Sequence, residues 1–260
     1  MMSQFDYNSY PGDYQYRAIA TGHPVQSFWH RTRLEAALAD VETKPEYRLL
    51  DVGCGAGVFT FGFANRISHA IGVDISTRSV EFCTKHKKEK GKVNCDFILV
   101  GQGESFPFKT ESIDVVLLTE VIEHLAPGGS YQLLHELARV LRPHGTLYLT
   151  TPNYHSLWPL VEKVLDASGK VPPLESKQHL QKFTPKLLAN QLEQMGFRVK
   201  ETNSFFVISP FVAPISLRIA NAFFAIEKRF AILPGMILTA VCTKYQSYYP
   251  EARLRNHYQT

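Results

Sequence analysis

The feature that most constrains this chain is the segment LLDVGCGAG at residues 49–57, where an apolar run ends in an acid and three glycines follow. Gly53, Gly55 and Gly57 stand between a run typical of a buried strand and a run typical of a helix. A backbone without Cβ atoms at this place lets a ligand approach the peptide groups closely. The segment therefore predicts a strand, a ligand-binding turn and a helix.

Short apolar runs alternate with helical patterns from residue 48 onward, and the helical patterns occupy 59–66, 77–90 and 130–141. Continuous apolar strands joined by helices are typical of a parallel sheet that is covered on both faces. The sequence predicts an α/β fold with a doubly wound, seven-stranded, mostly parallel sheet whose last two strands pair antiparallel. The expected strands are 48–52, 70–74, 96–100, 114–119, 146–151, 197–206 and 236–244.

Several segments are expected outside this wound core. The main domain covers 48–244, and ligands of open α/β sheets bind beyond the carboxyl ends of the strands. A cap before the sheet and insertions after the fifth and sixth strands are therefore expected to lie over that crevice. These segments are an N-terminal cap over 1–47 with a helix through 26–41, substrate-side insertions over 153–185 and 207–234, and a tail over 245–260.

Composition excludes several classes of protein. The net charge is +4, and the basic run at 85–92 has no interleaved aromatic residues, which disfavours a nucleic-acid partner. The four cysteines form no Cys-x-x-Cys pair, which argues against a zinc ribbon and favours a reducing compartment. Because the N-terminus lacks a basic segment followed by an apolar one, we expect no secretory signal and a cytoplasmic protein.

The glycine turn differs from the nicotinamide and flavin fingerprint. That fingerprint, G-x-G-x-x-G, requires a third glycine where this chain has Val58, and this disfavours an oxidoreductase. Asp74 follows Gly53 by 21 residues, at the end of the second expected strand. A carboxylate at this position accepts hydrogen bonds from both hydroxyls of a ribose.

LLDVGCGAG together with IGVDIS resembles the S-adenosylmethionine site of the class I methyltransferases. Four further segments agree in order and spacing, and the resemblance covers residues 30–200: GESFPF (103–108), SIDVVLLTEVIEHL (112–125), RVLRPHGTLYLTTPN (139–153) and KFTPKLLANQLEQMGF (182–197). The resemblance implies a Rossmann-like methyltransferase fold and S-adenosyl-L-methionine as the cofactor.

The resemblance also implies which residues bind the cofactor. Gly53 and Gly55 would face its methionine part and ribose, Gln102 would take the place of an acid near the adenine, and Thr119 would lie beside the methionyl portion. Arg33 matches an arginine that binds the cofactor in the ubiquinone-biosynthesis O-methyltransferases; an exposed helical arginine is the alternative. The expected cofactor-binding residues are Arg33, Asp51, Gly53, Gly55, Gly57, Asp74, Ile75, Gln102, Gly103 and Thr119.

The segment EVIEHL places Glu120, Glu123 and His124 at i, i+3 and i+4, and on a helix these positions share a face. Together with His179 downstream they form an expected site for a hard divalent cation, completed by water or substrate oxygens. The alternative is a structural helix start, because acids are favoured in a first helical turn. A histidine of this set is also a candidate general base.

This pattern resembles two groups of methyltransferases. The ubiquinone-biosynthesis O-methyltransferases carry Glu-x-x-Glu-His and a later His-x-x-Lys-Phe, which His179, Lys182 and Phe183 fit. The small-RNA 2′-O-methyltransferases use all four side chains on a metal. The resemblance implies Mg²⁺ bound to neighbouring acceptor oxygens. The candidate metal ligands are Glu120, Glu123, His124 and His179, and the candidate catalytic residues are His124 and Glu120.

An apolar stripe runs through the second insertion. Its members recur at helical spacing, which predicts an amphipathic helix whose stripe packs into the core. A lid or a membrane-surface face is the alternative. The stripe consists of Ile215, Ile219, Phe223, Ile226 and Phe230.

The function expected from these observations is transfer of a methyl group from S-adenosylmethionine to a small or lipid-like acceptor, on oxygen. A carbon or nitrogen acceptor, or the 2′-oxygen of RNA, is the first alternative. A catalytically silent subunit with the same fold is the second, and the intact glycines and Asp74 speak against it. Peripheral contact with a membrane is a further hypothesis, and the oligomeric state stays open.

Overall fold

The computed structural model describes residues 6–168, 174, 178–230 and 233–245. The expected tail over 245–260 lies outside these residues from position 246 on. The strands are β1 (Arg48–Val52), β2 (His69–Asp74), β3 (Cys95–Leu99), β4 (Ile113–Thr119), β5 (Leu141–Pro152), β6 (Phe197–Phe205) and β7 (Ile237–Lys244). The longer helices are α1 (Tyr14–Thr21), α2 (Pro24–Asp40), α3 (Val58–Phe63), α4 (Thr77–Glu89), α5 (Pro127–Val140), α6 (Trp158–Ser168), α7 (Pro185–Gln194) and α9 (Leu217–Phe230). Short helical turns are η1 (Tyr7–Ser9), η2 (Ile122–His124) and α8 (Ser209–Val212).

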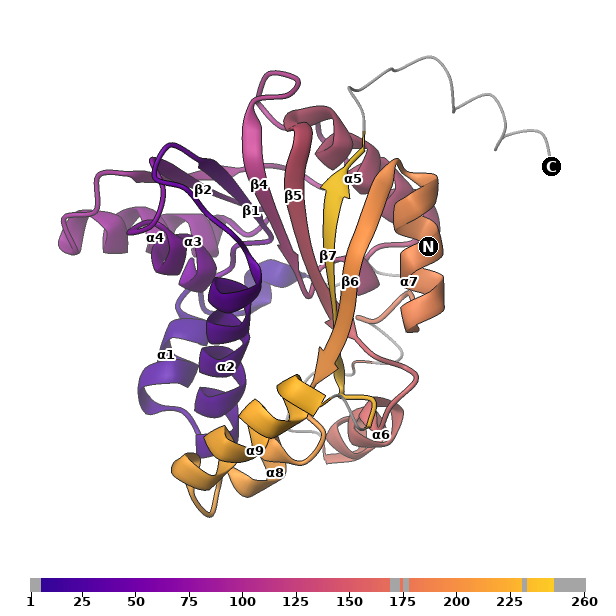
Figure 1. Ribbon diagram of the computed structural model, residues 1–260. Helices are drawn as coiled ribbons and strands as arrows, with labels where there is room; N and C mark the ends of the chain where they lie inside the picture. The colour runs from indigo at the N-terminus through magenta and orange to yellow at the C-terminus, as the bar shows by residue number, and fades with distance from the viewer. Residues whose placement is uncertain (1–5, 169–173, 175–177, 231–232, 246–260) are drawn as a thin grey trace.

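The seven strands form one sheet in the order β3-β2-β1-β4-β5-β7-β6 (Figure 1). β1 to β5 are parallel, and β7 runs antiparallel between β5 and β6. This confirms the predicted doubly wound, mostly parallel sheet with an antiparallel pair at its end. The chain order reverses between β1 and β4, and a ligand crevice in such sheets opens at that switch point.

Helices cover both faces of the sheet. On one face, leucines of α5 and α7 pack against the apolar side chains of the strands. On the other face, Phe59 and Phe63 of α3 and Ala37 of α2 do the same. β1 and β4 are buried along nearly their whole length because both of their faces are covered.

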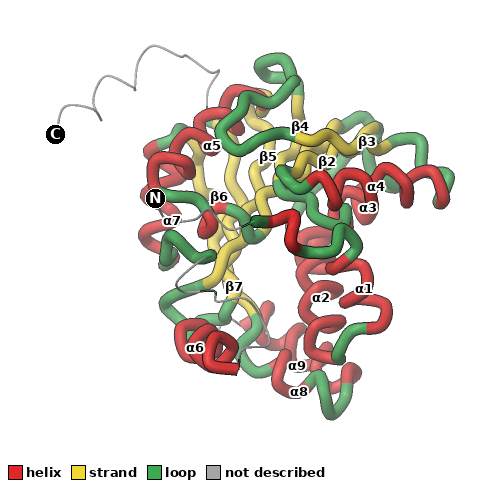
Figure 2. Tube along the Cα trace, turned by 180° about the vertical axis from the view of Figure 1, so that it is seen from behind, coloured by secondary structure: helices red, strands yellow, loops and turns green. Residues whose placement is uncertain are grey.

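Two helices form the N-terminal cap. α2 begins at Pro24, a residue favoured in a first helical turn, and matches the predicted helix. The sequence analysis did not predict α1, whose tyrosines and lack of a capping side chain give a weak helical signal. Figures 1 and 2 show the two helices side by side.

The second insertion joins β6 to β7 and contains α8 and α9. It is held to α2 by an apolar cluster in which Phe28 of α2 meets Phe206 and Phe224. Phe224 and Ala220 are the buried residues of α9. The prediction that the apolar stripe of this helix packs into the core is wrong, since Ile215, Ile219, Phe223, Ile226 and Phe230 are all exposed.

The predicted stripe is exposed because α9 has a second apolar side, which packs in its place. Phe224 and the small Ala220 fit against α2, so the larger stripe faces outward. Within the described parts of the chain, none of the helices has the length and apolar character needed to cross a bilayer.

Candidate functional site

The glycine loop connects β1 to α3 in a left-handed conformation. Gly53 and Gly57 both have φ of 72°. A Cβ on Gly53 would lie 2.4 Å from the Cγ2 atom of Val121, and a Cβ on Gly57 would lie 2.9 Å from the ring of Phe61. Both the backbone conformation and the close neighbours therefore require glycine.

Asp74 ends β2 and supports the same loop. Its Oδ2 atom accepts a hydrogen bond of 2.8 Å from the backbone N–H of Gly55, and its Oδ1 atom accepts one of 2.8 Å from Ser76. Burial raises the pKa of Asp74. A carboxylate has about four acceptor positions, so Asp74 can also accept bonds from the hydroxyls of a ligand.

Asp51 lies beneath the loop and is 1% exposed. Its Oδ2 atom accepts hydrogen bonds from the backbone N–H (3.0 Å) and the hydroxyl (2.7 Å) of Thr60. Among the described residues, its Oδ1 atom has no partner. Buried polar atoms are nearly always satisfied in native proteins, so this oxygen fits a donor on a ligand.

Burial gives Asp51 a defined effect on stability, because it raises the pKa of this carboxyl from 3.8 to about 6. The folded protein then holds a proton that the unfolded chain has lost between these two values, and the free energy of unfolding falls as pH rises through this window. An Asp51→Asn variant should therefore be more stable than the parent above pH 6, by about 1–3 kcal/mol. Below pH 4 the variant and the parent should have the same free energy of unfolding. Urea unfolding at several pH values measures this difference in the free energy of unfolding. A difference that stays the same at every pH would contradict the prediction.

Arg33 of α2 and Glu120 after β4 lie close to each other. Arg33 is 5% exposed, its guanidinium stacks 5.7 Å from the ring centre of Phe59, and its Nη2 atom is 3.8 Å from Oε1 of Glu120. The alternative of an exposed helical arginine is therefore wrong. Within the described chain the Nε atom of Arg33 has no partner, so this guanidinium has a donor left for a ligand.

The expectation that Glu120, Glu123 and His124 share one helical face is also wrong. Glu120 has φ of 55°, and only Ile122–His124 form a short helical turn. The turn directs Glu120 toward β5, where its Oε1 atom accepts a hydrogen bond of 2.8 Å from Thr150. Glu120 thus joins Arg33 on the cofactor side of the expected crevice.

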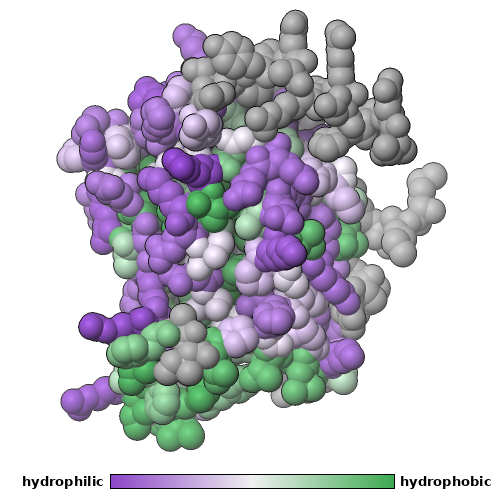
Figure 3. All heavy atoms as spheres, turned by 45° about the vertical axis from the view of Figure 1, so that its right-hand side comes forward, coloured by the Kyte–Doolittle hydropathy of each residue, from purple (hydrophilic) through white to green (hydrophobic). Residues whose placement is uncertain are grey.

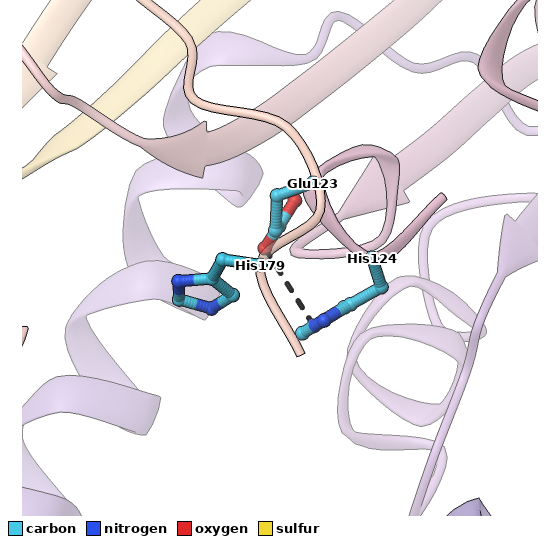
Figure 4. A group of neighbouring side chains, drawn as sticks. All are labelled: Glu123, His124 and His179. Atoms are coloured by element: carbon cyan, nitrogen blue, oxygen red, sulfur yellow. Dashed lines mark ion pairs between the residues drawn. The ribbon is translucent and has the colours of Figure 1, made fainter. Parts of the chain in front are cut away.

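Glu123, His124 and His179 come together from two segments that are distant in sequence (Figure 4). One candidate ligand atom from each lies within 4.8 Å of the others. In the described residues, Glu120 is not a member of this group. Glu123 is 1% exposed, its Oε2 atom accepts a bond of 3.0 Å from Thr151, and burial raises its pKa well above the ordinary value.

Both imidazoles of this group are oriented through Nδ1. In His124 this atom faces the carbonyl oxygen of Gln178 at 2.9 Å, and in His179 it faces Oε1 of Glu162 at 2.5 Å. Burial lowers the pKa of His124, and lowers that of His179 to about 3. Each ring is therefore neutral at pH 7, with the lone pair on Nε2 when Nδ1 carries the proton.

The N-terminal cap contacts both halves of the site. The Oε1 atom of Gln15 accepts a hydrogen bond of 3.2 Å from Ala56 in the glycine loop. The ring of Tyr7 lies 5.9 Å from that of His124, and burial, followed by the charges of Glu123 and Asp74, raises the pKa of Tyr7. The cap therefore brings Tyr7 between the glycine loop and the histidines.

The remaining expected cofactor residues follow the strand ends. Thr119, the last residue of β4, is buried, whereas Ile75 after β2 is 38% exposed. Gln102 and Gly103 lie in an exposed turn after β3. The sequence analysis missed Gln15, Glu162 and Tyr154, whose hydroxyl contacts both Glu162 and His179.

Comparison with known proteins agrees with this geometry. A family model described as a methyltransferase domain matches residues 50–149. The uncharacterized methyltransferase YcgJ of Bacillus subtilis is 29% identical over 153 residues, which are 58% of this chain and 59% of that protein. Its crystal structure superposes with a TM-score of 0.58 at 18% identity, over 84% of this chain and all of that chain. The chain thus carries a methyltransferase domain with the fold of the S-adenosylmethionine-dependent methyltransferases.

Two other similarities show what this resemblance leaves open. The ubiquinone biosynthesis O-methyltransferase of Hahella chejuensis is 33% identical over 109 residues, 42% of this chain and 44% of that protein. The [4+2]-cyclase SpnF superposes with a TM-score of 0.60 at 19% identity, over 83% of this chain and 80% of that one. The chain spans about half the length of the curated relatives it matches. Since proteins named for different reactions share this fold, the acceptor must be argued from the site.

Proposed function

We propose that this protein transfers a methyl group from S-adenosylmethionine to an oxygen of a small or lipid-like acceptor, with the help of a divalent cation. The buried, unpartnered oxygen of Asp51 beside the glycine loop is the main observation in favour of the cofactor. The group formed by Glu123, His124 and His179 favours a cation.

The residues around the glycine loop fit S-adenosylmethionine in charge and shape. Oδ1 of Asp51 would accept a hydrogen bond from the ammonium group, and Asp74 would accept bonds from the ribose hydroxyls. Arg33 would donate from its unpartnered Nε to the carboxylate. Bound there, the cofactor would supply an electrophilic methyl group on a positively charged sulfur.

The two histidines fit the role of ligands better than the role of general base. An imidazole with a pKa of about 3, such as His179, is too weak a base to take a proton efficiently at pH 7. A neutral imidazole whose Nδ1 proton goes to an acceptor is what a metal ion requires. Glu162 and the carbonyl oxygen of Gln178 are those acceptors.

The donor set changes the expected metal. Mg²⁺ prefers six oxygen ligands, whereas two imidazoles and one carboxylate suit Mn²⁺, Fe²⁺ or Zn²⁺. The expectation of Mg²⁺ is therefore replaced by one of these ions. Such a cation would lower the pKa of an acceptor hydroxyl and hold it in line with the methyl group.

Calorimetry tests the two parts of this proposal separately. Titration of S-adenosylhomocysteine should give one binding site, and titration of Mn²⁺ into the saturated protein should give a second. Methyl transfer from S-adenosylmethionine to catechols should then exceed transfer to simple phenols, because a catechol offers two neighbouring oxygens. Absence of S-adenosylhomocysteine binding would refute the methyltransferase function. If S-adenosylhomocysteine binds but the Mn²⁺ titration gives no heat, only the proposed metal site is refuted.

Glu162 is a positioning residue in this proposal, since it contacts His179 and not the acceptor. A Glu162→Gln variant keeps an acceptor for Nδ1 but loses the negative charge, and we expect Mn²⁺ affinity to fall about 10- to 100-fold. Binding of S-adenosylhomocysteine should be unchanged. The matched control is Glu136→Gln, a glutamate that pairs with Arg139 away from this group. Equal Mn²⁺ affinity in both variants would contradict the role of Glu162.

A further inference from the structure

The exposed stripe of α9 belongs to a larger apolar face. We define this face by Phe211, Ile215, Ile219, Phe223, Ile226 and Phe230, all of them exposed. Ile215 is 82% exposed and Phe230 is 60% exposed. Figure 3 shows apolar side chains gathered at the lower end of the molecule, where α8 and α9 lie. Contiguous exposed apolar surface of this kind marks a contact site on soluble proteins.

The exposed charged side chains of α9 itself are of one sign. Arg218 and Arg229 of α9 are exposed. Glu227, the acid of α9, faces the protein, where its carboxylate accepts bonds from the N–H groups of Val207 and Ser209. α9, which is described in full, therefore presents an apolar stripe bordered by cations to its surroundings.

The contacts of α9 with α2 show that this helix is partly buried. Lys228 pairs with Asp40 of α2 at 2.6 Å, which ties α9 to the rest of the protein. A groove of about 490 Å³ runs between α2 and α9, beside Phe224 and Arg229. One side of α9 is thus packed against the rest of the protein, and its opposite, apolar side is exposed.

We propose that this face binds the surface of an anionic lipid bilayer. An interfacial helix of this kind inserts its apolar side among acyl chains while its basic residues contact lipid phosphates. A second copy of the chain fits less well. In a two-fold contact the same face meets itself, and Arg218 and Arg229 would face one another with no exposed acid of α9 to balance them.

An apolar cluster connects α9 to the candidate metal group. The buried side of α9 shares an apolar cluster with Trp158, whose ring is 6.0 Å from that of His179. Attachment through the apolar face would therefore hold the crevice near the bilayer, where lipid-like acceptors dissolve. The lipid contact itself does not depend on methyl transfer.

Flotation with vesicles tests the proposal with the full chain and without cofactor or acceptor. The protein should float with vesicles of phosphatidylcholine and phosphatidylglycerol, and bind less to phosphatidylcholine alone. A variant with Ile215→Asn and Phe230→Asn should lose about tenfold or more of its vesicle affinity. Its matched control replaces two equally exposed residues elsewhere, Val93→Asn and Tyr245→Asn.

Charge reversal gives an independent readout. Arg218→Glu with Arg229→Glu should reduce binding to anionic vesicles about tenfold or more. Lys88→Glu with Lys90→Glu at the C-terminal end of α4 is the control, since both lysines are exposed and α4 lies apart from α9 (Figure 1). Test and control variants that bind equally well would overturn the proposal.

Sedimentation distinguishes the alternative of a second copy. Failure of the parent protein to float would overturn the lipid proposal. If the parent also forms a dimer that the Ile215→Asn and Phe230→Asn variant loses, the face is a contact between copies. Either result leaves the binding of S-adenosylhomocysteine untouched, so failure here is distinct from failure of the proposed function.

Discussion

An Asp74→Ala variant should bind S-adenosylhomocysteine about 10- to 150-fold more weakly than the parent. The lost hydrogen bonds to a charged carboxylate are worth about 1.5–3 kcal/mol. Part of the loss would come from the loop itself, because Asp74 also holds the N–H groups of Gly55 and Ser76. Calorimetry measures the dissociation constant, and thermal unfolding checks that the variant is folded.

The control for this variant is a second acid on the neighbouring strand. Asp96 of β3 is exposed and pairs with Lys87 and His69, away from the glycine loop. Asp96→Ala should leave the affinity for S-adenosylhomocysteine unchanged. If Asp74→Ala also leaves it unchanged, the assignment of Asp74 to the ribose is incorrect.

A His179→Ala variant should lose Mn²⁺ binding by at least about 100-fold, since removing one of three ligands costs more than removing a partner of a ligand. Binding of S-adenosylhomocysteine should remain within about twofold, because His179 contacts Glu162, Tyr154 and His124, which lie outside the glycine loop. Methyl transfer to catechols should fall with the loss of the cation. Calorimetry and a methyl-transfer assay at several Mn²⁺ concentrations separate the two effects.

His155 supplies the control for this substitution. It is an exposed histidine in the same insertion, and it lies outside the group formed by Glu123, His124 and His179. His155→Ala should behave as the parent does. A metal requirement that survives in His179→Ala would remove His179 from the ligand set and leave its contact with Glu162 as a structural one.

The sheet and the glycine loop could be predicted from the sequence because their signals are local. Each strand is a short apolar run, and the switch to helical spacing at Val58 marks where the loop must lie. The antiparallel end of the sheet followed from the proline and glycine near 234–235 that return the chain to the sheet. These patterns predict the type of element, and the crevice follows from the chain order of the strands.

Other features depend on neighbours that no local pattern reveals. The spacing in EVIEHL predicts a helix, but Glu120 adopts a left-handed conformation in which it meets Thr150 and Arg33. The stripe of α9 predicts an amphipathic helix, but not which side packs. The side of α9 that packs is the one with Phe224, which contacts Phe28 of α2 almost 200 residues earlier in the chain. No pattern in the sequence singles out Glu162, whose contact with His179 forms only in the folded chain.

The way the second insertion is anchored bears on how enzymes of this shape diversify. Phe205 pairs with Ile237, and the N–H of Gly235 donates to Ser204, so the excursion leaves and re-enters the sheet at one point. Doubling the length of such a closed excursion costs only about 0.6 kcal/mol in chain entropy. During evolution, α8 and α9 can therefore be lengthened, trimmed or exchanged without moving Asp51 or Asp74 on the opposite half of the sheet. We therefore expect changes in this one insertion to give access to new acceptors, while the residues proposed to bind the methyl donor are inherited intact.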